Sequence, residues 1–133
     1  MILVDTNVLL DVVEDDPEWA DWSQQQLDAA RLRAPLAINP VIYAELSMAF
    51  ERIEQLDRVV TTAGLIEAPI PREALFLAGK AFLSYRRRRG AKRSVLPDFL
   101  IGAHAAVSGL PLLTRDLRRY RTYFPTVELL GAN

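Results

Sequence analysis

The chain lacks several residues and motifs that whole classes of protein require. It has no cysteine and one histidine, His104, which excludes disulfides, thiolate metal sites and cysteine nucleophiles and argues against a His-rich zinc site. No apolar run approaches the roughly 20 residues that cross a bilayer. Met1 leads directly into an apolar run, leaving no room for a signal peptide, so we expect a cytoplasmic protein. The phosphate-binding glycine motifs of nucleotide-binding folds are also absent.

The remaining composition is that of an ordinary globular protein. Its 133 residues are 50% hydrophobic and 25% charged, which predicts a single domain, residues 1–133, with a real core. The formal net charge is −1, but acidic residues gather in the N-terminal part and basic residues later. A dense basic stretch either binds a polyanion or is a solvated helix end. Its members are Arg86, Arg87, Arg88, Arg89, Lys92 and Arg93, followed by Arg115, Arg118, Arg119 and Arg121.

Short apolar runs alternate with longer segments of helical periodicity. We expect strands at 2–4, 36–38, 65–68 and 111–114, and a fifth at 127–129. We expect helices at 7–13, from 17 onwards, at 40–50, from 53 to near 64, at 72–89 and at 97–108. This alternation with short connections predicts an α/β fold with a parallel sheet flanked by helices.

Four carboxylates stand where such a fold would bring them together. Asp5 and Asp116 follow the first and fourth strands, so both are expected at the carboxyl ends of parallel strands, where ligand sites form. Glu45 and Asp98 lie on intervening helices. Clusters of oxygen ligands bind hard cations such as Mg²⁺ or Mn²⁺.

Each acid also has a structural explanation. Asp5 and Asp116 are placed to cap helices, and Asp98 stands at a helix start, where it opposes the helix dipole. Glu45 is more informative, because it shares a helix face with apolar residues and burying a carboxylate there is costly unless it is paired or coordinated. His104 is interpreted as a packed side chain rather than a ligand.

Four segments of the sequence together resemble the PIN-domain ribonucleases, and specifically the VapC toxins of prokaryotic toxin–antitoxin pairs. Their order and separations fit that family across nearly the whole chain. The segments are ILVDTNVLL at 2–10, NPVIYAEL at 39–46, LPDFLIGAHA at 96–105 and LLTRD at 112–116.

The resemblance implies a PIN-like three-layer sandwich and a Mg²⁺- or Mn²⁺-dependent endoribonuclease. It implies a metal held by Asp5, Asp98, Asp116 and Glu45, with the Thr114 hydroxyl supporting a carboxylate. It also implies an RNA substrate, a VapB-type antitoxin and a homodimer. The alternatives are a DNA-directed or structure-specific nuclease and a catalytically inactive binding module. Our candidates for RNA phosphate contacts are Arg86, Arg87, Arg88, Arg89, Lys92, Arg93 and Arg115.

Overall fold

A computed structural model describes residues 1–89 and 96–131. Its centre is a five-stranded, fully parallel sheet in the order β3-β2-β1-β4-β5. The strands are β1 (Ile2–Val4), β2 (Leu36–Ile38), β3 (Ile66–Glu67), β4 (Leu112–Thr114) and β5 (Leu129–Gly131). The α/β class and the parallel sheet that the sequence predicted are therefore confirmed.

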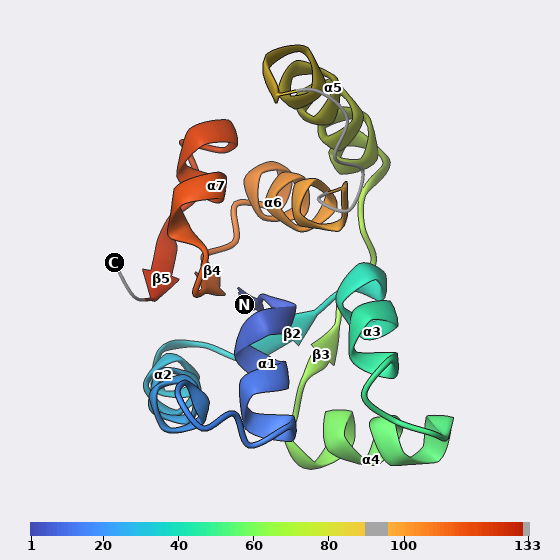
Figure 1. The fold of residues 1–133 in the computed structure, drawn as a ribbon, viewed down its shortest axis with the longest axis vertical. Helices are drawn as coiled ribbons and strands as arrows, with labels where there is room; N and C mark the ends of the chain where they lie inside the picture. The colour runs from blue at the N-terminus through green and yellow to red at the C-terminus, as the bar shows by residue number, and fades with distance from the viewer. Residues whose placement is uncertain (90–95, 132–133) are drawn as a thin grey trace.

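Helices cover both faces of this sheet, which makes the fold a three-layer sandwich. Figure 1 shows α1, α2 and α4 on one side of the strands and α6 and α7 on the other, with α5 beside α6. The helices are α1 (Thr6–Val13), α2 (Ala20–Arg33), α3 (Pro40–Ser47), α4 (Ile53–Thr62), α5 (Arg72–Arg89), α6 (Leu96–Ser108) and α7 (Leu117–Tyr123). Within the described ranges, no helix is long and apolar enough to span a bilayer.

The strand order reverses between β1 and β4, because the chain builds outward from β1 on one side and then returns to add β4 and β5 on the other. Crevices for ligands form at such a switch point, beyond the carboxyl ends of the strands. The strands β1 and β4 at this switch point are completely buried, and their apolar side chains fix the register. The residues that follow them therefore lie at the carboxyl edge of the sheet. The topology therefore places Asp5 and the segment from Thr114 to Asp116 side by side.

The predicted elements and the observed ones differ mainly in α7. Residues 117–123 stand out in the sequence only as a basic group, but they form a helix that buries Leu117 and Tyr120. The expected strand at 127–129 begins two residues later, at Leu129, and the helix expected from residue 17 begins at Ala20. The helix expected from residue 40 does begin there, as α3; Asn39 caps it, because its side chain accepts a hydrogen bond from the Ile42 amide.

Gly102 sets the distance between α6 and α7. A Cβ built at this position would lie 2.4 Å from Phe124 Cδ2 and 3.0 Å from Tyr120 Cδ1, and both aromatic side chains are buried. The close neighbours of Gly102 thus belong to α7 and to the residue that follows it, so the absence of a side chain here lets α7 lie close against α6.

We therefore expect Gly102→Ala to lower the free energy of unfolding by about 1–3 kcal/mol, the usual cost of overpacking a core. Gly79→Ala in α5 is the matched control, since its added Cβ meets nothing within 4 Å and a helical Gly→Ala exchange stabilises by up to about 1 kcal/mol. Urea denaturation measures the free energy of unfolding, which should fall in Gly102→Ala and rise in Gly79→Ala. Equal stability of Gly102→Ala and the parent would contradict the close packing.

Candidate active site

Asp5 is the most buried of the four predicted acids, with 4% of its surface exposed. It is the N-cap of α1: its Oδ1 accepts a hydrogen bond from the Thr6 amide at 2.8 Å. Its Oδ2 accepts from the Thr114 hydroxyl at 2.7 Å and from the Tyr120 hydroxyl at 3.1 Å. Burial raises the pKa of Asp5 to about 7; the hydrogen bond from Thr114 opposes the rise, and the nearby charge of Asp98 adds to it.

Thr114 joins Asp5 to Asp116. It is the last residue of β4 and fully buried. While its hydroxyl donates to Asp5, its Oγ1 accepts a hydrogen bond from the Asp116 amide at 2.9 Å. The ends of the two central strands are thus linked through one hydroxyl group, and Asp116 is held next to the buried Asp5.

Thr6 makes the corresponding link to Glu45 on α3. Its hydroxyl donates to Glu45 Oε1 at 2.5 Å, while its amide donates to Asp5. One residue therefore contacts two of the four acids. This bond explains how a glutamate is accommodated on the apolar face of α3, since a partner offsets part of the cost of removing the carboxylate from water.

Asp98 reaches the same edge from the first turn of α6, where it pairs with Arg119 of α7. The same guanidinium nitrogen of Arg119 lies 3.8 Å from Asp116 Oδ2. Burial raises the pKa of Asp98; Arg119 opposes this shift, and the charges of Glu45 and Asp116 add to it. The charges of Glu45 and Asp116 thus act on Asp98, and the charge of Asp98 acts on Asp5, so all four acids share one electrostatic environment.

The donors at this edge are suited to a hard divalent cation, because all four predicted ligands offer carboxylate oxygens. The high pKa of Asp5 also marks a buried carboxylate whose negative charge lacks full compensation. As the side chains lie, however, no three acidic or histidine residues among 1–89 and 96–131 are close enough together to hold one ion. The acids are linked in pairs at one edge, so forming a three-ligand shell requires side-chain rotation.

The model of the PIN domain family matches residues 2–125 of the sequence. The chain belongs to the PIN domain family. This assignment confirms the resemblance that the four sequence segments suggested. PIN domain nucleases are hydrolases that act on phosphodiester bonds and generally use divalent metal ions.

Solved structures share the PIN fold over almost the full length of both chains. VapBC2 from Rickettsia felis, bound to a DNA fragment from its promoter, has a TM-score of 0.73 at 18% identity and covers 100% of each chain. DNA-bound VapBC from Salmonella typhimurium has a TM-score of 0.69 at 20% identity, with 98% coverage of each chain. A toxin–antitoxin complex from Klebsiella pneumoniae has a TM-score of 0.64 at 24% identity, covering 96% of this chain and 95% of that one. No curated protein sequence matches this chain.

The Arg115 side chain is held by contacts with other residues of the PIN domain, Asp11 and Trp19. Its guanidinium makes two hydrogen bonds to Asp11, at 2.7 and 2.9 Å, and lies 4.7 Å from the centre of the Trp19 ring. Asp11 is buried and also accepts a hydrogen bond from Ser23 at 2.6 Å. The side chain therefore fastens the end of β4 to α1 and α2; contact with RNA phosphate by Arg115 stays a prediction.

We expect Arg115→Gln to lower the free energy of unfolding by about 1–3 kcal/mol, because it leaves a buried carboxylate with fewer donors. Arg118→Gln removes the same charge from an exposed neighbour and should change stability by less than about 0.5 kcal/mol. Thermal unfolding followed by circular dichroism compares the two. Similar small effects would show that the pair with Asp11 contributes nothing.

His104 is a buried residue of α6 whose Nδ1 lies 3.1 Å from the side-chain nitrogen Nδ2 of Asn39. Burial lowers the pKa of His104. Asn39 caps α3, the helix that carries Glu45. The contact with His104 therefore joins the start of α3 to α6, the helix that carries Asp98. His104 is therefore packed in the interior, as predicted from the sequence.

The basic stretch adjoins the helix that carries Asp98. Arg86, Arg87 and Arg88 are exposed in the last turns of α5, directly after the buried Tyr85, whose ring lies 5.5 Å from that of Phe99. Phe99 follows Asp98 in sequence, so this turn of α5 stands beside the first turn of α6. Arg89 ends α5, its side chain not being described, and Lys92 and Arg93 lie outside the described residues.

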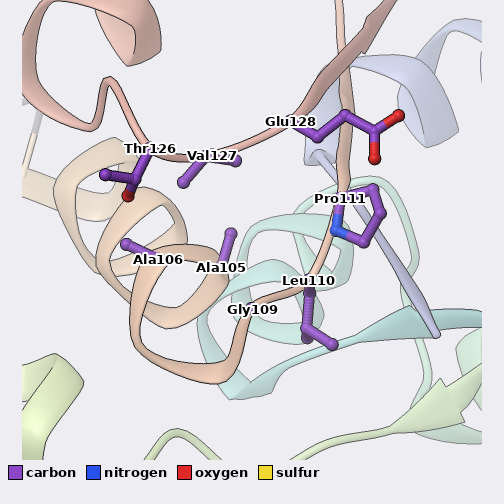
Figure 2. Close-up of a pocket in the computed structure, with 8 residues that line it drawn as sticks. All are labelled: Ala105, Ala106, Gly109, Leu110, Pro111, Thr126, Val127 and Glu128. Carbon is purple, nitrogen blue, oxygen red and sulfur yellow. The ribbon is translucent and has the colours of Figure 1, made fainter.

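A pocket of ≈ 130 Å³ lies at the opposite edge of the sheet (Figure 2). Its lining comes from the end of α6 and from the segments that precede β4 and β5, including Pro111 and Val127. The one charged lining residue, Glu128, pairs with Arg33 at 3.2 Å. This pocket therefore has no part in the acidic edge.

The contacts that three residues make with the acids were not predicted from the sequence: those of Thr6 and Tyr120, and those of Arg119, which was noted only as one of the basic residues. The last two are on α7, which was not predicted. A signal was present, because Leu117, Tyr120 and Phe124 recur at helical spacing, but the three arginines among these residues drew attention to charge instead. Nothing local to Thr6 indicates a bond to a residue 39 positions away.

Proposed function

We propose that this PIN domain chain is a metal-dependent endoribonuclease and the toxin of a VapBC-type toxin–antitoxin pair. One observation carries the proposal: Asp5 and Asp116 meet at the switch point of the sheet through Thr114, with Glu45 and Asp98 brought to the same edge. Acids gathered at the strand ends are what phosphodiester hydrolysis assisted by a divalent cation needs. The similarity in fold to the VapBC structures supports the toxin assignment.

In the proposed reaction, Asp5, Asp98 and Asp116 would hold Mg²⁺ or Mn²⁺, which would supply Lewis acidity for activating water and neutralising charge on the phosphate. Thr114 and Tyr120 keep Asp5 oriented toward the edge. Glu45, held by Thr6, completes the ligand set or accepts the proton of the attacking water. The products are expected to carry 5′-phosphate and 3′-hydroxyl ends.

The exposed arginines of α5 are proposed to contact the RNA backbone, because they stand beside the helix start that carries Asp98. Replacing Arg86, Arg87 and Arg88 together by Gln is expected to weaken RNA binding and to reduce the slope of log K against log salt by about 2, at roughly 0.7 per lost phosphate contact. Fluorescence anisotropy across a salt series measures both quantities.

Arg33→Gln is the control for this experiment, since Arg33 pairs with Glu128 near the opposite edge and its loss should leave the slope unchanged. An unchanged slope in the triple variant would rule out the arginines of α5 as phosphate contacts.

The proposed partners are a VapB-type antitoxin and a second copy of the chain. Large apolar side chains are available for such contacts: Met48 and Ile53 stand exposed at the ends of α3 and α4, and Phe76 on α5. A groove of ≈ 230 Å³ between α3 and α4, lined by Tyr43 and Phe50 among others, adjoins the helix that bears Glu45. Light scattering should give twice the 15.0 kDa chain mass for a homodimer.

Matched oligonucleotides of identical sequence, one RNA and one DNA, test the choice of substrate in the presence of Mn²⁺. The proposal predicts cleavage of RNA with little or no cleavage of DNA. Preferential DNA cleavage would replace it with the DNA-directed alternative. Cleavage of neither, by folded protein tested on total cellular RNA as well, would favour a binding module.

A further inference from the structure

Arg119 supplies both ion pairs that the four acids make among the described residues. Its Nη1 hydrogen-bonds Asp98 Oδ2 and lies 3.8 Å from Asp116 Oδ2. This one nitrogen therefore stands between carboxylates that arrive from two elements, α6 and the segment after β4. It occupies the space between the two acids to which a shared cation would bind.

The backbone around Arg119 is anchored, whereas its side chain is partly exposed to solvent. The next residue, Tyr120, is completely buried and bonded to Asp5, so α7 is anchored on the acidic edge. The side chains of Arg119 and Asp98 are 30% and 27% exposed, and that of Asp116 is 42% exposed. A long side chain at that exposure can turn outward without unpacking the helix.

A divalent cation and a guanidinium cannot both occupy this position. They would use the same Asp98 oxygen, and two positive charges a few ångströms apart repel strongly where solvent is partly excluded. We therefore propose that Arg119 is an internal competitor of the metal, which binds Asp98 and Asp116 only when the guanidinium leaves them. The inference rests on the proposed function, because it concerns the metal used there.

This exchange gives Arg119 two effects of opposite sign. With no added metal, it relieves repulsion among the clustered carboxylates and stabilises the fold. With metal present, its displacement costs part of the binding free energy and so weakens the apparent affinity. A residue that merely held α7 in place would have the first effect without the second.

The test measures Mn²⁺ affinity by the electron paramagnetic resonance signal of free Mn²⁺, at fixed ionic strength, for the wild type and three variants. Arg119→Gln is expected to bind Mn²⁺ about tenfold more tightly, and to melt at a lower temperature than the wild type when no metal is added. Arg119→Lys keeps the positive charge and should restore an affinity near that of the wild type. Arg118→Gln removes an exposed neighbouring charge and should leave the affinity within about twofold.

Equal or weaker Mn²⁺ binding by Arg119→Gln would overturn the competition while leaving metal-dependent catalysis intact. An equal gain in Arg119→Gln and Arg118→Gln would also overturn it, since net charge alone would then explain the change. Absence of Mn²⁺ binding in all four proteins, each folded by circular dichroism, would instead remove the proposed metal dependence itself. The two failures are thus separable.

Discussion

Asp5→Asn is expected to abolish RNA cleavage and, without added metal at pH 8, to make the protein more stable. The exchange is nearly isosteric, and the amide oxygen can still accept the hydrogen bond from Thr6 that caps α1. It removes a buried negative charge whose pKa burial has raised from 3.8 to about 7. A rise of roughly three pKa units corresponds to about 4 kcal/mol of destabilisation when the group ionises. The Asn amide nitrogen cannot accept the hydrogen bonds that Oδ2 receives from Thr114 and Tyr120, at about 1 kcal/mol each, so a net gain of about 1–2 kcal/mol is expected.

The loss of activity should be larger than the 10–100-fold that removing a group which merely supports a metal ligand typically costs. Asp21→Asn is the control, because Asp21 is exposed on α2 and should alter neither activity nor stability by much. Urea denaturation and a fluorogenic RNA assay measure the two effects on the same preparations. An Asp5→Asn protein that retains cleavage, or that loses several kcal/mol of stability, would contradict the role assigned to this carboxylate.

The stability of the wild type without added metal is expected to fall as the pH rises from about 4 to about 7 through the contribution of Asp5. Folded Asp5 keeps its proton up to about pH 7, whereas the unfolded carboxyl releases it near 3.8. The folded state therefore binds more protons within this window, and the free energy of unfolding decreases with pH. Saturating Mn²⁺ should restore stability above pH 7, by roughly 2.7 kcal/mol at a hundredfold excess over Kd.

Unfolding at pH 5 and pH 8, with and without Mn²⁺, checks this prediction. His104 contributes with the opposite sign: because burial lowers its pKa, stability is lost as the pH falls below the usual value of about 6.5. The difference between the wild type and Asp5→Asn at each pH isolates the aspartate from the histidine. A difference that does not vary with pH would show that Asp5 is not the titrating group.

The sequence predicted those parts of the fold that depend on local signals. Apolar runs located β1, β2 and β4 to within a residue, and the helix expected from residue 40 begins there as α3. Because side chains that follow parallel strands share an edge of the sheet, the sequence alone predicts that Asp5 and Asp116 lie close together.

The features that the sequence did not predict depend on packing between distant segments. The hydroxyl of Thr6 donates a hydrogen bond to Glu45 only because α1 and α3 pack together. Arg119 reaches Asp98 only because Gly102 lets α7 lie close against α6. Neither position differs locally from an ordinary helix residue, so no pattern within a short window would distinguish it.

The most direct test of the central claim is cleavage of total cellular RNA by the purified chain with Mn²⁺, with a chelator, and with Asp98→Asn in parallel. Asp98→Asn keeps the shape of the side chain at the start of α6 while removing its charge. The proposed function predicts discrete fragments with Mn²⁺ that disappear both with the chelator and in the variant. Fragments that persist in either control would contradict a metal-dependent nuclease built on these four acids.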